Sequence, residues 1–236
     1  SSINYKLSIK LGELLRVGGR DNMLSFLSVI GKLLKRQYIR EDDIKTIYLN
    51  DPYFYDWKNE KGTKIGILVY SSYFQAGDIS FVDKLINILR DHELTPRVIF
   101  VKTLKNLSIQ KKLIDILKSE CIRILITTTS FSINNSSENE NFFNKLAEFN
   151  VPTFQMLIST ISKRKWRNSS RGMCPSDLSL QVVLPEIDGR ITTKIIAFRE
   201  QLEVNSTLST TIYITKPDND SMLWCIQLIQ SWLTLK

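Results

Sequence analysis

Apolar and polar positions alternate along the middle of this chain in two regular patterns. Four short, continuous apolar runs are typical of strands that are buried on both faces of a parallel sheet. They cover residues 64–70, 97–101, 123–128 and 151–158. Three amphipathic segments, at 78–90, 107–118 and 138–149, separate the runs and carry apolar residues on one helical face. This alternation predicts an α/β fold with a Rossmann-like parallel sheet, flanking helices and right-handed crossovers.

The two ends of the chain follow different patterns. Residues 8–37 have helical spacing on both sides of a break at Gly18 and Gly19, and Asp21 or Asn22 is expected to cap the second helix. The later segments are predicted as a basic polar stretch at 159–174, a short helix at 175–183, a turn at 185–190, strands at 191–199 and 211–215, and a helix at 218–235 capped by Asp218 or Asp220.

These patterns predict three parts. Residues 1–63 form an N-terminal helical segment followed by a connecting loop at 38–63, and residues 64–158 form the Rossmann-like domain. Residues 159–236 form a C-terminal α+β extension, which packs on the same domain or on an adjoining one.

Composition places the chain among globular proteins. Hydrophobic residues make up 43% and charged residues 24%, which excludes wholesale disorder. The sequence contains no uninterrupted apolar run of the roughly 18 to 20 residues that a membrane span requires. Residues 1–10 lack the apolar centre of a signal peptide. We therefore expect a soluble, cytoplasmic protein without a membrane span.

Cysteine and histidine are scarce. The three cysteines, Cys121, Cys174 and Cys225, are far apart in the sequence, and we expect reduced, mostly buried thiols rather than disulfides or a zinc cluster. His92 is the single histidine. This count argues against a His-based catalytic triad or a multi-His metal site in this chain.

The net charge of +8 favours an anionic partner. Part of the excess lies in one cluster without acidic neighbours, which consists of Lys163, Arg164, Lys165, Arg167 and Arg171. Nucleic acid, a polycarboxylate ligand and an acidic protein all remain open. A nucleic-acid-binding module is one alternative, although the sequence has no recognised motif for that role. A free-standing enzyme would need a phosphate loop or an activated nucleophile, and the sequence shows neither.

Ligands of Rossmann-like sheets bind where the strands end. Those ends lead into residues 71–77, 127–135 and 159–171. The first loop, SSYFQAG, is not a GxGxxG motif and gives no support to a dinucleotide site. The second is rich in hydroxyl and amide groups, which can bond carboxylate or amide groups of a ligand. The alternative is that both loops are solvated connections that cap the following helices.

The most specific segment is 151–200, VPTFQMLISTISKRKWRNSSRGMCPSDLSLQVVLPEIDGRITTKIIAFRE. It resembles the family of CobN and magnesium-chelatase large subunits, in which a VP-led strand is followed by W, RG, P, D, LPE, DGRI and F. The matching positions are Val151, Pro152, Gln155, Ser159, Trp166, Arg171, Gly172, Pro175, Asp177, Val183, Leu184, Pro185, Glu186, Asp188, Gly189, Arg190, Ile191 and Phe198. Gly18, Gly19 and Asn22 also match a GG-x-x-N turn of this family, and the DGRI sequence favours its cobalt branch.

The resemblance implies a function as part of a larger machine. It implies a fragment of the N-terminal half of the tetrapyrrole-binding large subunit of an ATP-dependent cobaltochelatase, which inserts cobalt into a corrin ring during cobalamin biosynthesis. The implied partners are the remainder of that subunit, AAA+ ATPase subunits that hydrolyse ATP, and the tetrapyrrole itself. The fragment alone is expected to be inactive and to bind no cofactor. The alternative is the corresponding magnesium-chelatase H subunit of chlorophyll biosynthesis.

Six residues of this segment are candidates for ligand binding. They are Trp166, Arg171, Asp177, Glu186, Asp188 and Arg190, and we expect them to converge near the strand ends. Glu186 and Asp188 can meet a metal ion or a proton on a macrocycle nitrogen, or can instead hold a local turn. Arg171 and Arg190 can pair with ligand carboxylates or with carboxylates of the chain. Trp166 can stack on a planar macrocycle or pack on its own domain. No residue is identified as catalytic.

Overall fold

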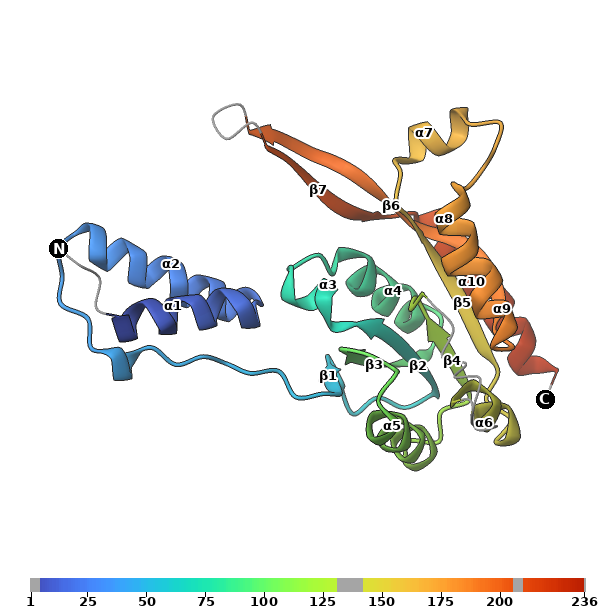
Figure 1. Ribbon diagram of the computed structural model, residues 1–236. Coiled ribbons are helices and arrows are strands. Elements are labelled where there is room, and N and C mark those ends of the chain that lie inside the picture. The colour runs from blue at the N-terminus through green and yellow to red at the C-terminus, as the bar shows by residue number, and fades with distance from the viewer. Residues whose placement is uncertain (1–4, 131–141, 206–209, 236) are drawn as a thin grey trace.

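The computed structural model describes residues 5–130, 142–205 and 210–235 (Figure 1). Within them seven strands form one sheet in the order β1-β3-β2-β4-β5-β6-β7. The strands are β1 Tyr53–Tyr55, β2 Thr63–Tyr70, β3 Leu94–Val101, β4 Ile124–Thr127, β5 Thr153–Ser159, β6 Ile191–Asn205 and β7 Thr210–Pro217. The helical segments are α1 Tyr5–Val17, α2 Arg20–Leu34, η1 Glu41–Asp43, α3 Ser71–Gln75, α4 Ser80–Asp91, α5 Leu107–Ser119, α6 Phe142–Glu148, α7 Lys163–Asn168, α8 Pro175–Leu178, η2 Ser179–Val183, α9 Leu184–Ile187 and α10 Asn219–Thr234.

The predicted parallel sheet is confirmed. Strands β3, β2, β4, β5 and β6 pair in parallel, and antiparallel strands are added at both edges, β1 beside β3 and β7 beside β6. The strands predicted at 191–199 and 211–215 are β6 and β7, and β6 runs on to Asn205. One expectation was wrong, because residues 53–55 of the predicted connecting loop form strand β1.

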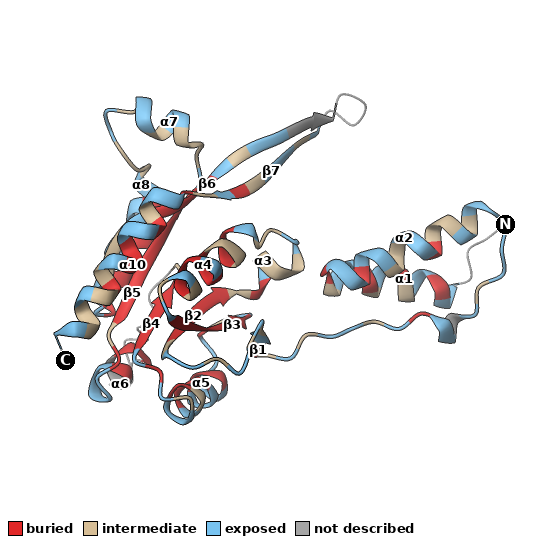
Figure 2. Cartoon of the chain, turned by 180° about the vertical axis from the view of Figure 1, so that it is seen from behind, coloured by how far each residue is buried: buried red, intermediate tan, exposed pale blue. Residues whose placement is uncertain are grey.

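Helices cover both faces of the sheet. The side chains of β2 alternate between two cores, since Ile67 packs with α4 and α10 whereas Leu68 packs with α5 and α6. Figure 2 shows the central strands as buried and the outer faces of the helices as exposed. The helices predicted at 78–90 and 107–118 are α4 and α5. The third, predicted at 138–149, is α6; its first residues, 138–141, lie outside the described residues.

The N-terminal helices form a hairpin with its own small core (Figure 1). Gly18 and Gly19 break the two helices as predicted, with φ values of 67° and 88°. The expected capping by Asp21 or Asn22 was wrong, because the cap position is Gly19 and no side chain bonds there. Asn22 is buried one turn further on, where its amide donates to the carbonyls of Gly18 and Ile47 and accepts from the N–H of Ile47. It fastens the following loop to the helix.

The segment before β6 differs from the prediction. Helices α8, η2 and α9 run on from one another, so the turn predicted at 185–190 was wrong for its first half. Pro185 lies near the start of α9, directly after the π-helical turn. The chain turns at Asp188 and Gly189, and Gly189 has φ of 76°.

Asp218 caps α10 as predicted, accepting from the N–H of Ser221 at 3.1 Å. Burial raises the pKa of Asp218, but the ion pair with Lys163 and the bonds from Ser221 outweigh it and lower the pKa below 3.8. A lowered pKa means that the ionised group stabilises the fold above pH 3.8 and that this contribution is lost as the pH falls through the folded-state value.

We therefore expect Asp218→Asn, which keeps the cap, to lower the free energy of unfolding at pH 7 and to have a smaller effect as the pH falls below 3.8. Urea unfolding across that range measures the difference. The matched control is Asp220→Asn, at an exposed position of the same helix turn. An effect of Asp218→Asn that does not change with pH would contradict this assignment.

Candidate functional site

A cavity of about 230 Å³ lies where the parallel strands end. Its walls come from the ends of β2, β4 and β5, from the helix that precedes β6, and from β6 and β7. The lining residues include Tyr70, Tyr73, Asp78, Thr128, Ser130, Ile158, Ser159, Thr160, Asp177, Gln181, Arg199 and Thr215. This is the position at which Rossmann-like sheets bind ligands, and all three predicted loops contribute to it.

The cavity opens because neighbouring strands differ in length. Strand β4 ends at Thr127, opposite Gln155, whereas β5 continues to Ser159. Beyond Gln155 no strand pairs with β5 on the β4 side among the described residues. There the side chain of Gln181 accepts from the N–H of Ile158 at 2.8 Å and donates to its carbonyl at 2.7 Å. One side-chain amide thus replaces a neighbouring strand.

The local helix geometry places Gln181 at that position. Residues 179–183 form a single π-helical turn between α8 and α9. Such turns carry an extra residue per turn and shift the direction of the side chains that follow them. Gln181 is buried, so both polar atoms of its amide need partners, and the backbone of Ile158 supplies both.

The two carboxylates in the cavity wall are already bonded. Asp177 accepts from the N–H and the hydroxyl of Thr160, at 3.0 and 2.8 Å, and both bonds end on Oδ2. Asp78 accepts from the N–H and the hydroxyl of Thr215, at 2.8 and 2.5 Å, with one bond on each oxygen. These contacts join four separate segments of chain around the cavity in two pairs.

The donors in the wall are less fully used. The hydroxyl of Thr128 is buried and has no hydrogen-bond partner within the described part of the chain. Burial raises the pKa of Tyr73, as do the charges of Asp78 and Asp177, while the charge of Arg199 opposes them. The phenol therefore stays protonated and can donate. Arg199 is exposed and lies over the ring of Tyr213, 5.2 Å from its centroid.

A buried arginine ties the chain after β4 to β5. The guanidinium of Arg190 bonds the carboxylate of Asp188 at 2.8 Å, the carbonyl of Thr129 at 2.7 Å and the amide oxygen of Gln155 at 2.9 Å. It also lies 4.0 Å from the centroid of the Phe143 ring. Burial lowers the pKa of Arg190, and the charge of Asp188 opposes this effect. The network holds the chain after β4, which carries Thr128, against β5.

The predicted site residues have different surroundings. Asp188 and Arg190 form an ion pair with no exposed side-chain surface, so Arg190 pairs with a carboxylate of the chain, which is one of the two alternatives that the sequence left open. Trp166 packs against Phe198, with ring centroids 5.7 Å apart. Glu186 accepts from the hydroxyl of Thr192 at 2.9 Å. Arg171 is exposed, whereas Asp177 is buried in the cavity wall.

Among the residues that line the cavity, sequence reasoning selected only Asp177 as a site residue. Tyr73 and Thr128 lie in the loops at 71–77 and 127–135, and the position of these loops at the strand ends is the signal that could have identified them. Arg199 was visible only as the end of a predicted strand. No pattern identifies Gln181, whose place depends on the π-helical turn.

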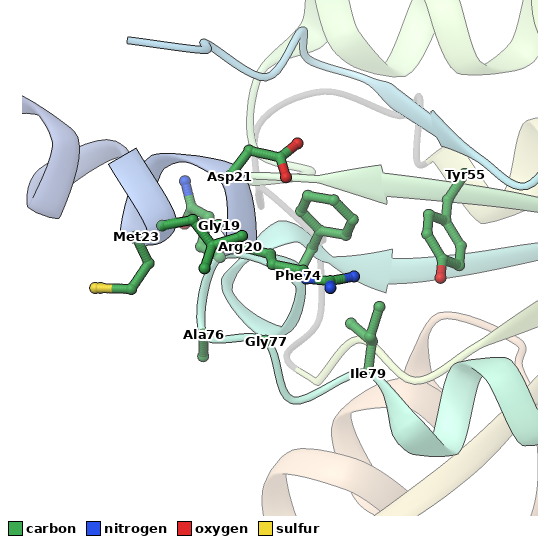
Figure 3. A pocket seen from close by; sticks show the side chains of 11 residues that line it. Gly19, Arg20, Asp21, Met23, Tyr55, Phe74, Ala76, Gly77 and Ile79 are labelled. Carbon is green, nitrogen blue, oxygen red and sulfur yellow. The ribbon is translucent and has the colours of Figure 1, made fainter. Parts of the chain in front are cut away.

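A second, larger groove of about 600 Å³ lies between the N-terminal hairpin and α3 (Figure 3). Its wall is mainly apolar, with Phe74 and Ile79 on one side, and the side chain of Arg20 lies close to Phe74. Tyr55 lines it as well, and its hydroxyl donates to Asp83 at 2.8 Å. Burial raises the pKa of this phenol, and the bond to Asp83 adds to the effect. The residues that line this groove are far in sequence from the predicted site residues.

Neither a metal-binding cluster nor a membrane-spanning helix occurs among the described residues. Among residues 5–130, 142–205 and 210–235, no group of three or more His, Cys, Asp or Glu side chains is arranged to hold a metal ion. The helices of the same residues include none that is both long and apolar enough to cross a membrane.

The three cysteines are free, and of these only Cys225 is buried, so the expectation of mostly buried thiols was wrong.

Comparison with known proteins gave consistent matches. Residues 13–236 match the family model described as CobN/Magnesium Chelatase. An aerobic cobaltochelatase subunit CobN of Pseudomonas aeruginosa is 26% identical over 182 residues, which are 76% of this chain and 14% of that protein. An uncharacterized protein of Methanocaldococcus jannaschii is 31% identical over 149 residues, 59% of this chain and 12% of that protein.

A solved structure has the same fold. The catalytic subunit of cobaltochelatase from Mycobacterium tuberculosis superimposes with a TM-score of 0.72 and 18% identity. The match covers 92% of this chain and 18% of that one. The chain therefore spans less than a fifth of the relatives that it matches.

Proposed function

This chain belongs to the CobN/magnesium chelatase family, and we propose that it is a section of the tetrapyrrole-binding large subunit of an aerobic cobaltochelatase. The observation that carries the proposal is the family match over nearly the whole chain. The relative from Pseudomonas aeruginosa is a cobaltochelatase subunit. The DGRI sequence at 188–191 supports the cobalt branch over the magnesium branch.

In this proposal the metal is a substrate, and ATP is hydrolysed by AAA+ partner subunits. We assign different tasks to five of the six predicted residues. Asp177 lines the strand-end cavity and meets the ligand, whereas Asp188 and Arg190 are positioning residues that hold the loop after β4. Trp166 supports the fold through Phe198, and Glu186 through Thr192.

The chain cannot supply the whole reaction in this proposal. It corresponds to 14% of the length of the Pseudomonas relative, so most of the macrocycle contacts belong to the remainder of the subunit. We expect residues 1–236 alone to insert no cobalt, because the ATPase partners and that remainder are both required.

A titration of the intact polypeptide with a metal-free corrin tests the proposal. We expect saturable quenching of tryptophan fluorescence, and insertion of cobalt, followed by corrin absorbance, when the ATPase subunits, ATP and Co²⁺ are added. The matched comparison uses a metal-free porphyrin with Mg²⁺. Magnesium insertion without cobalt insertion would contradict the cobalt assignment, and cobalt insertion by residues 1–236 alone would contradict the proposed division of labour.

A further inference from the structure

We propose that the exposed side of helix α2 binds an acidic amphipathic helix from the part of the large subunit that lies outside residues 1–236. The surface itself follows from the described residues; only the source of the helix rests on the proposed function. Four features support this assignment: a second apolar stripe on α2, a glycine within that stripe, the adjoining groove and the charge of the hairpin.

Helix α2 carries apolar residues on two sides. On the side that faces α1, Phe26 and Val29 belong to the core of the hairpin. A second stripe consists of Leu24, Leu27 and Leu34, which are 54%, 57% and 81% exposed. Their spacing of three and seven residues places them on one side of the helix, as in the seam between two packed helices. Because a surface helix of a globular protein needs only one apolar face, the second stripe indicates an interaction site.

Gly31 lies within this stripe, one helical turn from both Leu27 and Leu34. A glycine in the middle of a helix destabilises it relative to alanine. A Cβ atom added at Gly31 would meet no atom of the surrounding chain within 4 Å, so no described contact requires a glycine here. The missing side chain does, however, let another backbone approach closely. The position therefore fits the point at which a second helix crosses α2.

The stripe continues into the groove of about 600 Å³ between the hairpin and α3 (Figure 3). Leu24 belongs to both, and Phe74 and Ile79 extend the apolar surface beyond α2. Figures 1 and 2 show that the hairpin meets the sheet domain at this end. A helix that lies along α2 can therefore place a side chain in the groove. A flat lipid surface would use neither the groove nor the glycine, which favours a helix as the occupant.

The charge of the hairpin favours an acidic partner over a second copy of the chain. Residues 5–40 contain eight Lys and Arg against two acidic residues, a net charge of +6. Lys35 and Arg36, exposed at the C-terminal end of α2, pair with no acidic residue of the described chain. Two such hairpins would repel each other, whereas Asp and Glu beside the apolar residues of another helix would complement them.

The remainder of the subunit is the source to which we assign this helix. The matched residues cover 14% of the Pseudomonas relative, so a far longer part of such a subunit lies outside residues 1–236. A helix of the same polypeptide docks at a high effective concentration, so a seam as short as the one from Leu24 to Leu34 suffices.

Thiol labelling of the intact polypeptide, resolved by peptide mass spectrometry, tests this inference. We expect iodoacetamide to react at least about tenfold more slowly with the Leu27→Cys variant than with the Ser8→Cys variant, because the docked helix covers the stripe. Ser8 lies at an exposed position of α1 and serves as the control. The two rates should become equal in concentrated urea. Leu24→Cys serves if Leu27→Cys does not fold.

Gly31→Leu, added to Leu27→Cys, fills the crossing point and should remove that protection. The matched control is Gly12→Leu on α1, where an added Cβ atom also meets nothing within 4 Å, and it should leave the protection unchanged. Lys35→Glu should raise the labelling rate about two- to fivefold, since it repels an acidic partner.

Equal labelling of the folded Leu27→Cys and Ser8→Cys variants would overturn the inference. Protection that depends on protein concentration would overturn it as well, because it indicates a second copy. So would protection that appears only with vesicles containing phosphatidylglycerol, because it indicates a membrane. The labelling needs neither corrin nor cobalt, so its failure is distinct from a failure of the titration above.

Discussion

Replacing Arg190 with alanine will destabilise the chain by about 3–5 kcal/mol, because it leaves the carboxylate of Asp188 buried without its partner. Both side chains of this pair have no exposed surface. The same substitution removes donors from the carbonyl of Thr129 and the amide oxygen of Gln155. Urea unfolding at pH 7 measures the loss, and in the intact subunit corrin binding or cobalt insertion should weaken with it.

The matched control for Arg190→Ala is Arg164→Ala. Arg164 carries the same charge but is exposed on α7, so its loss should change the free energy of unfolding by less than about 0.5 kcal/mol. A second variant, Arg190→Lys, keeps the charge but cannot reproduce three bonds from one planar group. Its loss of unfolding free energy should lie between those of Arg190→Ala and Arg164→Ala. If Arg190→Ala and Arg164→Ala behave alike in both stability and chelation, Arg190 has neither the structural nor the positioning role assigned here.

Replacing Gln181 with leucine will have the second largest effect, about 2 kcal/mol or more. Leucine keeps the approximate shape but leaves the N–H and the carbonyl of Ile158 buried without partners, and each unsatisfied group costs about 1–3 kcal/mol. Besides urea unfolding, hydrogen exchange at the Ile158 amide gives a local measurement and should accelerate strongly.

Gln227→Leu is the matched control for Gln181→Leu, since Gln227 is exposed on α10. It should change stability by no more than about 0.5 kcal/mol. Slow exchange at Ile158 in the Gln181→Leu variant would show that the side-chain amide does not take the place of a strand at this position.

The central sheet was predictable because its signal is local. A strand buried on both faces must be apolar throughout, and Ile65 to Val69 are. The start of β3 was not predicted, since Pro96 ends the apolar pattern. The missing N–H of Pro96 is tolerated because β1 pairs only with residues 98–100 of β3. On the β1 side, Pro96 therefore has no strand neighbour.

The site was only partly predictable because its contacts join distant segments. Asn22 was expected to be a helix cap on local grounds, yet its partner Ile47 is 25 residues away. Arg190 was selected through a family pattern, but the pattern does not say whether its partner is a ligand or the chain; the structure gives Asp188. Gln181 depends on a π-helical turn, for which the sequence carries no signal that we recognise.

The unequal length of β4 and β5 also bears on how this fold can vary. The space at the strand ends exists because β4 ends four residues before β5 does, counted from Gln155 to Ser159. Residues gained or lost after Thr127 would change the depth of that space while leaving the parallel register at 124–127 untouched. Insertion or deletion at this one point would therefore change the size of the cavity without rebuilding the sheet.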